Sequence, residues 1–238
     1  MAIFFVSDVH LSPKRAQVTS AFYEFLSSHG RKATDLFILG DLFETWIGDD
    51  DPSDLAVTTQ NRLKELTLSG TKLFVQHGNR DFLLGRRFMN KTGAVLIHDY
   101  HVIEAYNQRI LVTHGDLLCS DDLAYQAFRR KTRNPIYRWI LSHLPLSKRQ
   151  EMASRWRAET TRQSSRKPST IMDVSRTTVQ RVMSTTNTVK LIHGHTHKPA
   201  RHKLSSGNKE RIVLGDWESS GWAVRLDQKG IELFDFVI

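Results

Sequence analysis

Five short polar motifs, each at the end of an apolar run, constrain the fold of this chain more than any other feature. The runs read as β-strands, because they are short, rich in aliphatic and aromatic residues, and followed by turn-forming residues. Beyond the carboxyl ends of strands in an open α/β sheet, such residues converge on one crevice. The motifs are Asp8-Val9-His10, Gly40-Asp41, Gly78-Asn79-Arg80-Asp81, His114-Gly115-Asp116 and Gly194-His195-Thr196-His197.

Strands alternate with helices in the first half of the chain and pair as hairpins in the second. Strands are expected at 2–8, 35–39, 72–76, 94–97, 101–105, 109–113, 189–193, 211–214, 222–226 and 231–236. Helices are expected at 15–28, 54–68, 82–91, 123–165 (interrupted by Pro135 and Pro145) and 171–185. This order predicts an α/β fold in one domain, 1–238, with two sheets packed face to face and helices outside.

The chain contains one cysteine, Cys119, so a disulfide framework is excluded and a reducing compartment is expected. The apolar start at 2–6 is too short for a signal peptide. No apolar run is long enough to span a membrane. We therefore expect a cytoplasmic protein.

The positive charge of the chain is concentrated in one segment, 123–170. This segment holds twelve Lys and Arg residues and two acidic residues, whereas the whole chain has a net charge of +9. Such a segment indicates an anion site, a membrane-surface site or a nucleic-acid site, or simply a solvated helix face. Interleaved aromatic and aliphatic residues make the solvated face the weaker interpretation.

The motifs supply carboxylate, imidazole and amide ligands, which suit two divalent metals side by side. Asp8 and His10 are two residues apart and point the same way on an extended chain, as do His195 and His197. The two carboxylate oxygens of Asp41 can bridge two metals. A metal pair lowers the pKa of a bound water and holds a phosphate oxygen. Each motif alone is more often a turn or helix cap, but five in order predict a site.

This series resembles the calcineurin-like metallophosphoesterase superfamily over residues 8 to about 217. The resemblance implies a four-layer α/β/β/α fold and a two-metal site. It also implies two ligand sets that share Asp41. One metal would be held by Asp8, His10, Asp41 and His197, and the other by Asp41, Asn79, His114 and His195.

Arg80 departs from the superfamily pattern, which has a histidine there that aids the leaving group. Arginine does not donate a proton at neutral pH, but it clamps phosphate and stabilises developing charge. A phosphate leaving group needs no protonation, whereas an alkoxide does. Arg80 therefore favours cleavage of a pyrophosphate. An outer salt bridge is the plainer alternative.

The strings at 40–50, 78–82 and 214–217 resemble the family of UDP-2,3-diacylglucosamine pyrophosphatases of the lipid A pathway. This family carries a helical, basic and apolar insertion, to which 123–170 corresponds as a lipid-binding cap. The implied reaction is attack of water on the α-phosphorus, giving UMP and 2,3-diacylglucosamine 1-phosphate (lipid X). Mn²⁺ is the implied cofactor. Catalysis would rest on Asp41 and Arg80.

The resemblance also implies the substrate contacts. Arg157 and Lys167 are expected to meet phosphate, and Asp122 the sugar or nucleotide. Thr160 keeps the hydroxyl usual at its position, while Ser164 is shorter than the usual asparagine. Asn79, Arg80 and His195 would also touch substrate. An acyl groove is expected from Phe128, Tyr137, Trp139, Ile140, Leu141, Leu144 and Trp156, although packing of the cap explains some of them equally well.

The expected partners are the diacylated nucleotide and the surface of the inner membrane, which Arg129 and Arg130 would touch as parts of a peripheral protein. No nucleic acid and no obligate protein partner is expected. Two alternatives stay open. One is another superfamily phosphodiesterase or nuclease, which the basic segment also suits. The other is a metal-binding scaffold without catalysis.

Overall fold

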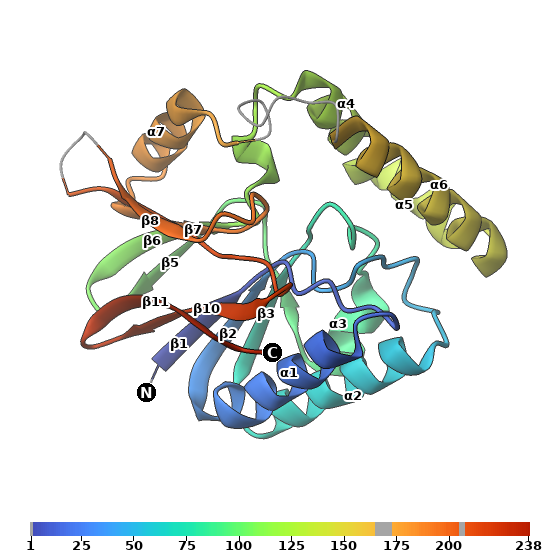
Figure 1. Cartoon of the computed structure of the whole chain (residues 1–238), viewed down its shortest axis with the longest axis horizontal. Helices are drawn as coiled ribbons and strands as arrows, with labels where there is room; N and C mark the ends of the chain where they lie inside the picture. Colours follow the sequence, from blue (N-terminus) through green and yellow to red (C-terminus); the bar gives the residue numbers. More distant parts are fainter. Residues whose placement is uncertain (1, 165–172, 205–207) are drawn as a thin grey trace.

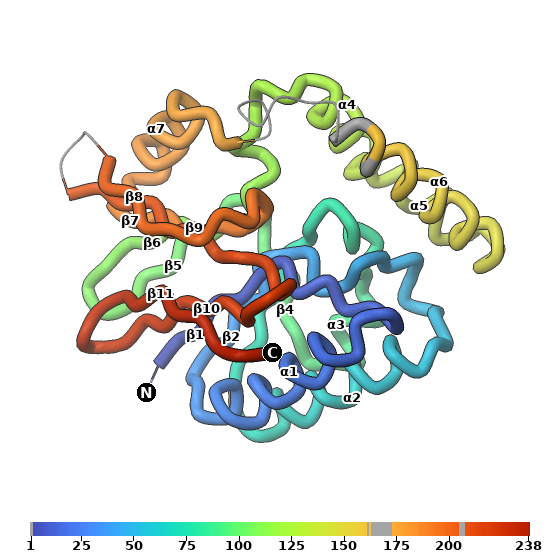
Figure 2. Tube along the Cα trace, viewed as in Figure 1, coloured from blue at the N-terminus to red at the C-terminus, as the bar shows by residue number. Residues whose placement is uncertain are grey.

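The computed structural model describes residues 2–164, 173–204 and 208–238, without the side chains of 161, 163 and 164. Its chain forms a four-layer α/β/β/α sandwich, as expected (Figure 1). Two sheets lie face to face in the middle, and helices cover both outer faces. A helical arm, formed by 123–164, projects from one end of this body (Figures 1 and 2).

The first sheet has six strands among the described residues, four of them parallel. In spatial order they are β11 (Gly230–Val237), β10 (Ser220–Asp227), β1 (Ala2–Val6), β2 (Ala33–Leu39), β3 (Lys72–Gln76) and β4 (Val95–Leu96). The second sheet has five described strands, of which β6, β7 and β9 are parallel. Their order is β5 (His101–Ala105), β6 (Gln108–Thr113), β7 (Lys190–His193), β9 (Glu210–Val213) and β8 (Ala200–Lys203).

The helices fall into two groups, those of the body and those of the arm. The body helices are α1 (Ala16–Ser28), α2 (Asp54–Leu68) and α3 (Arg86–Thr92) on the first sheet, α7 (Arg176–Thr185) on the second, and the short 3₁₀ helices η1 (Gly30–Lys32) and η2 (Asp116–Leu118). The arm, which we call the cap, contains α4 (Leu123–Arg133), α5 (Pro135–His143) and α6 (Leu146–Ser164). The cap helices break at Pro135 and Pro145, as the sequence predicts. Among the described residues, no helix is long and apolar enough to cross a membrane.

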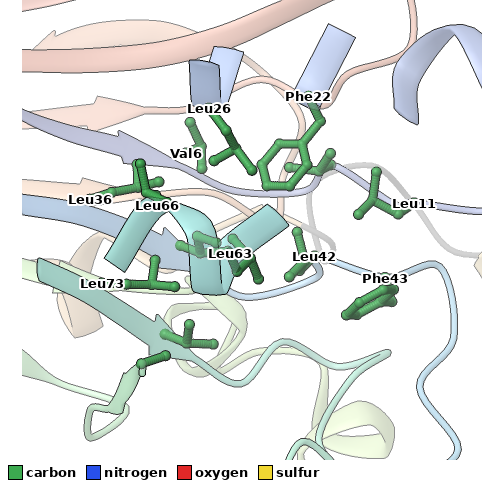
Figure 3. Close-up of a cluster of buried hydrophobic side chains, with 14 of the residues drawn as sticks. Val6, Leu11, Phe22, Leu26, Leu36, Leu42, Phe43, Leu63, Leu66 and Leu73 are labelled. Carbon is green, nitrogen blue, oxygen red and sulfur yellow. The ribbon is translucent and has the colours of Figure 1, made fainter. Parts of the chain in front are cut away.

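Central strands such as β1 and β2 are buried on both faces, because successive side chains point to opposite sides and both sides are covered. In β1, Phe4 and Val6 face the helices, whereas Ile3 and Phe5 face the second sheet. Figure 3 shows the cluster on the helix side, where side chains from the first sheet, α1 and α2 meet. Burying a side chain of this size contributes about 1.5–3 kcal/mol. The two hydrophobic clusters, one on each side of the first sheet, hold its strands in place, and the polar motifs follow the ends of these strands.

Three elements differ most from the sequence prediction. Strand β8 was not expected, and it pairs with β9. Helix α3 begins at Arg86 rather than 82, because the Asp49 carboxylate accepts hydrogen bonds from the backbone N–H groups of Gly85 and Phe88 and caps it there. Helix α7 begins at Arg176 rather than 171, with 173–175 non-helical.

Candidate metal centre and adjoining cavity

The polar motifs meet where the parallel strands of both sheets end. Asp8, Asp41 and Asn79 follow β1, β2 and β3 of the first sheet. His114 and His195 follow β6 and β7 of the second. The backbone N–H of His195 donates to Asp8 Oδ2 at 2.8 Å, which ties the two sheets together at this edge. The predicted crevice therefore receives side chains from both sheets.

Asp8, His10 and His197 form one cluster of ligand-type atoms. His197 Nε2 lies 3.3 Å from Asp8 Oδ1 and 3.4 Å from His10 Nε2. The other ring nitrogen of His197, Nδ1, lies 3.2 Å from a carboxylate oxygen of Asp216, in the loop after β9. A carboxylate in this position fixes the orientation of a ligating imidazole. Nε2 of His197 is thereby directed at Asp8.

Asn79, His114 and His195 form a second cluster, and Asp41 lies between the two. Asn79 Oδ1 is 3.1 Å from His114 Nε2 and 3.0 Å from His195 Nδ1. His114 Nδ1 lies 2.9 Å from the carbonyl oxygen of Leu39, which leaves Nε2 directed into the site. Asp41 Oδ1 is 4.0 Å from His114 Nε2, and Asp41 Oδ2 is 4.0 Å from His10 Nδ1. Its two oxygens thus face different clusters.

The backbone at these residues is strained. Five site residues have φ between 52° and 68°, in the left-handed region that non-glycine residues rarely adopt. They are Asp8, His10, Asp41, His195 and His197. The remaining non-glycine residues with positive φ in the described chain are turn residues, Tyr106, Asn107 and Asn187. Strain of this kind costs about 1–3 kcal/mol per residue and persists where function requires it. The left-handed backbone conformation directs these five side chains into the site.

Gly78 and Gly194 have no side chain, and the carboxylates of Asp41 and Asp8 occupy the space that a side chain would take. A Cβ at Gly78 would lie 2.0 Å from Asp41 Oδ1, and a Cβ at Gly194 would lie 2.1 Å from Asp8 Oδ2. Any side chain at either position would push a carboxylate out of place. This explains why both motifs begin with glycine.

The donor set fits divalent metals. Asp8 Oδ1 and His10 Nδ1 are buried and make no hydrogen bond within the described residues. An unpaired buried polar atom is costly, so such atoms indicate an additional binding partner. Ligand-type atoms of Asp8, His10 and His197, and separately of Asp8, Asp41 and His114, lie within 4.8 Å of one another. Buried carboxylate and imidazole groups at this spacing suit two adjacent cations.

Asp81 and Asp116, the last residues of the third and fourth motifs, hold loops and a cap helix in place. Asp81 accepts hydrogen bonds from the backbone N–H groups of Leu42 and Gly78, and so joins the second and third motifs. Burial, together with the nearby Asp41, raises the pKa of Asp81 to about 7. Asp116 accepts from Tyr125 Oη and Arg129 Nε, both at 2.7 Å, and so anchors α4.

Glu44, which the sequence analysis did not single out, connects Arg80 to the cap. Its carboxylate forms ion pairs with Arg80 and with Arg157 of α6. Arg80 Nε also lies 3.5 Å from Asp41 Oδ2. The Arg80 side chain therefore reaches both the metal-type ligands and the mouth of the site. No local sequence pattern marks Glu44, because its two partners lie 36 and 113 residues away in the chain.

Much of the positive charge of the cap is used to hold the cap on the body. Arginines of α4, α5 and α6 bind groups of the body loops, namely Arg129 (Asp99 and Asp116), Arg133 (His77 and Gly78 carbonyls), Arg138 (Leu84 carbonyl), Arg149 (Asp50 and Ile47 carbonyl) and Arg157 (Glu44). The expectation that Arg129 touches lipid is wrong, because Arg129 is buried between two aspartates. Arg130 is exposed.

Two cavities adjoin the polar clusters and share Asn79 and Arg80 in their walls. The first encloses about 750 Å³, open solvent included, between the cap and the body loops. Its wall is mainly apolar and includes Trp46, Ile47, Phe82, Leu83, Phe128, Leu141, Met152, Ala153 and Trp156. The second is a wider, more polar cleft that contains Asp41, His195 and His197.

The expected acyl groove is thus partly correct. Phe128, Leu141 and Trp156 line the apolar cavity, and Tyr137 lines the polar cleft. Trp139 and Ile140 are instead 62 % and 46 % exposed on the outside of α5. Leu144 lines neither cavity. The body loops and Met152 supply much of the wall, which the sequence analysis did not anticipate.

The remaining predicted substrate contacts surround the two cavities. Arg157 lines the apolar cavity, Asp122 lines the polar cleft, and Thr160 borders both. Asp122 also caps α4 by accepting from the Tyr125 N–H at 3.1 Å. Lys167 and the side chain of Ser164 lie outside the described residues.

Comparison with known proteins identifies similar sequences over the whole chain. The model of the calcineurin-like phosphoesterase family matches residues 1–199. UDP-2,3-diacylglucosamine hydrolase of Pseudomonas fluorescens is 46 % identical over 99 % of this chain and 96 % of that protein. Proteins of the same name are 43 % identical in Pseudomonas aeruginosa, over 97 % of both chains, and 42 % identical in Azotobacter vinelandii, over 100 % of both.

Solved structures with a similar fold are distant in sequence. An archaeal phosphodiesterase superposes with a TM-score of 0.52 at 13 % identity, over 100 % of both chains. Vacuolar protein sorting 29 of Cryptosporidium parvum superposes with a TM-score of 0.50 at 14 % identity, over 100 % of this chain and 98 % of that one. At this identity the likeness concerns the fold alone.

Proposed function

This chain belongs to the calcineurin-like phosphoesterase family, and we propose that it hydrolyses the pyrophosphate bond of UDP-2,3-diacylglucosamine. The products would be UMP and 2,3-diacylglucosamine 1-phosphate, as in the synthesis of lipid A. The observation that carries the proposal is the junction at Asn79 and Arg80, where a polar centre opens directly onto an apolar cavity. A substrate with a diphosphate beside two acyl chains needs both environments in contact.

We propose that two divalent ions bind at the strand ends, and that they are Mn²⁺, the ion that the family resemblance implies. Asp8, His10, Asp41 and His197 would hold one ion, and Asp41, Asn79, His114 and His195 the other. The buried, unbonded Asp8 Oδ1 and His10 Nδ1 support this assignment. When bound, such a pair lowers the pKa of a water molecule and polarises a phosphate oxygen.

Arg80 is proposed to stabilise the charge that develops on the diphosphate when the α-phosphorus is attacked. The guanidinium offers several donors in a fixed plane, which match phosphate oxygens. Its side chain borders both cavities, so it can reach a diphosphate at their junction. The departing sugar phosphate is a stable anion and needs no proton donor. Arg157, paired with the same glutamate, would add a second positive charge beside this position.

The direct test measures UMP release from UDP-2,3-diacylglucosamine by the purified protein with Mn²⁺. We expect turnover that EDTA abolishes and that fails with UDP-glucosamine lacking acyl chains. Equal turnover of bis-para-nitrophenyl phosphate and the lipid would instead favour a general phosphodiesterase. Absence of turnover with any phosphoester by the metal-loaded protein would favour a scaffold. Five of the eight arginines in the described part of the cap bind groups of the body and are not available to nucleic acid, whereas Arg130, Arg155 and Arg162 are exposed.

Filling the apolar cavity should weaken binding of the acylated substrate without touching the polar centre. Ala153 of α6 lines this cavity, whereas Ala158 of the same helix is exposed. Overpacking a filled space costs about 1–3 kcal/mol, so Ala153→Phe should raise KM for the lipid about tenfold. Ala158→Phe is the matched control and should leave KM unchanged. An unchanged KM in Ala153→Phe would show that the acyl chains bind elsewhere.

The outer face of α5 is proposed to rest on the inner membrane, which would make this a peripheral protein. Ile136, Trp139 and Ile140 lie at helical spacing and are 71 %, 62 % and 46 % exposed. Arg130 and Lys131, at the end of α4, are exposed on the adjoining helix. Apolar side chains flanked by cations are typical of helices that lie on anionic membranes.

Trp139→Ser combined with Ile136→Ser should lower binding to vesicles containing anionic lipid about tenfold. The measurement is cosedimentation with vesicles of phosphatidylglycerol and phosphatidylethanolamine. Leu68→Ser is the control, because Leu68 is 77 % exposed on α2 of the body. Equal loss in the control, or no loss in the α5 variant, would contradict the proposed surface.

A further inference from the structure

The third motif holds two groups of the site on neighbouring residues. Asn79 Oδ1 lies within 3.1 Å of ring nitrogens of His114 and His195. The side chain of the next residue, Arg80, reaches Glu44 and Asp41. A small shift of this short loop would therefore move a candidate ligand and a phosphate-binding group together. The loop needs support from outside the site.

That support comes from the last residue of α4. Arg133 Nη2 donates to the carbonyl oxygens of Gly78 at 2.8 Å and of His77 at 3.2 Å. These carbonyls immediately precede Asn79 and lie 55 and 56 residues before Arg133 in the chain. Hydrogen bonds from a charged donor are among the stronger ones in proteins. The guanidinium thus holds the backbone of the loop rather than a side chain.

Arg133 is itself held in place, because α4 is fixed to the body one turn earlier. Arg129 Nε donates to Asp116 Oδ2 at 2.7 Å, and its Nη2 lies 2.8 Å from Asp99 Oδ1. Tyr125 Oη donates to the same Asp116 oxygen at 2.7 Å. Asp116 is buried, so these hydrogen bonds are shielded from water. The helix is therefore a firm support for Arg133.

We propose that Arg133 is a positioning residue, which acts through the Gly78–Asn79 backbone to hold Asn79 and Arg80 in register with the histidines. Mutating residues that orient metal ligands typically weakens metal binding or activity about ten- to a hundredfold. The proposal also makes the cap part of the metal centre rather than a lipid-binding addition alone. It rests on the proposed function only in the choice of lipid substrate.

The test compares Arg133→Ala with Arg155→Ala, which removes the same charge from an exposed position on α6 of the cap. Three quantities are measured: Mn²⁺ affinity by electron paramagnetic resonance, kcat and KM for UDP-2,3-diacylglucosamine, and kcat for bis-para-nitrophenyl phosphate. We expect Arg133→Ala to weaken Mn²⁺ binding several-fold and to lower kcat about tenfold for both substrates. KM for the lipid should change less than twofold. Arg155→Ala should match the wild type.

A rise in KM with unchanged kcat would overturn the proposal, because Arg133 would then bind substrate directly. Unchanged Mn²⁺ affinity and kcat would overturn it as well. If Arg133→Ala does not fold, Arg133→Lys tests the proposal instead. Lysine keeps one charged donor group, so we expect an intermediate kcat. Wild-type values in Arg133→Lys would count against positioning by the guanidinium. If the wild type cleaves only the small diester, the lipid assignment fails, but Mn²⁺ binding and diester turnover still test Arg133.

Discussion

Asp41→Ala is expected to lower kcat by more than about a thousandfold, beyond the hundred- to thousandfold effect of losing a single charge-stabilising group. The two carboxylate oxygens of Asp41 face different clusters, one toward His10 and the other toward His114. Removing them would take a ligand from both proposed metals. Turnover of UDP-2,3-diacylglucosamine with saturating Mn²⁺ is the measurement.

Asp41→Asn separates loss of charge from backbone strain. Asp41 has φ of 52°, which asparagine tolerates better than alanine does. Burial raises the pKa of Asp41, so its charge is unfavourable in the metal-free fold. We therefore expect Asp41→Asn to lose activity while unfolding at the same or a higher temperature than the wild type without metal. Wild-type turnover in Asp41→Asn would contradict the bridging role.

Asp235→Ala is the control for removing an aspartate. Asp235 is exposed on β11, an edge strand of the first sheet. Its replacement should leave both kcat and Mn²⁺ affinity unchanged. A comparable loss in Asp235→Ala would mean that the effect of Asp41 is not specific to the site.

Arg80→Ala is expected to lower kcat about a hundredfold, with a smaller change in KM. Its guanidinium borders both cavities and pairs with Glu44, so it lies where the diphosphate of the substrate is proposed to bind. Because the charge on phosphate grows as the bond breaks, losing a fixed cation should penalise the transition state more than the bound substrate. A loss confined to KM would contradict this role.

Two further variants sharpen the interpretation of Arg80. Arg80→Lys keeps the charge but loses the planar donor fork, and it should recover only part of the activity. Arg87→Ala removes an exposed cation from α3 and should have no effect. If Arg80 only formed an outer salt bridge with Glu44, then Glu44→Gln would reduce kcat as much as Arg80→Ala does. We expect Glu44→Gln to be the milder change.

The contacts made by the cations of the basic segment 123–170 could not be predicted from the sequence. Its charge excess was read as a surface for phosphate or lipid, and α5 remains a candidate for the latter. Arg129, Arg133 and Arg149, however, are satisfied by Asp116, by loop carbonyls and by Asp50. A count of charges does not reveal their partners, because those partners are backbone and side-chain groups 13 to 99 residues away. Only the folded chain shows which cations of the cap bind groups of the body and which are exposed to solvent.

The sequence by itself determined the fold class and the order of the polar motifs along it. Two-sided burial of short strands dictates a layered α/β structure, and the carboxyl ends of parallel strands must share an edge. Which atoms face one another was decided by the tertiary structure. Left-handed backbone at Asp8 and Asp41 and the missing Cβ at Gly78 aim the carboxylates inward. The supports at Glu44 and Arg133 arise only when the cap folds back on the body, since long-range contacts leave no local pattern.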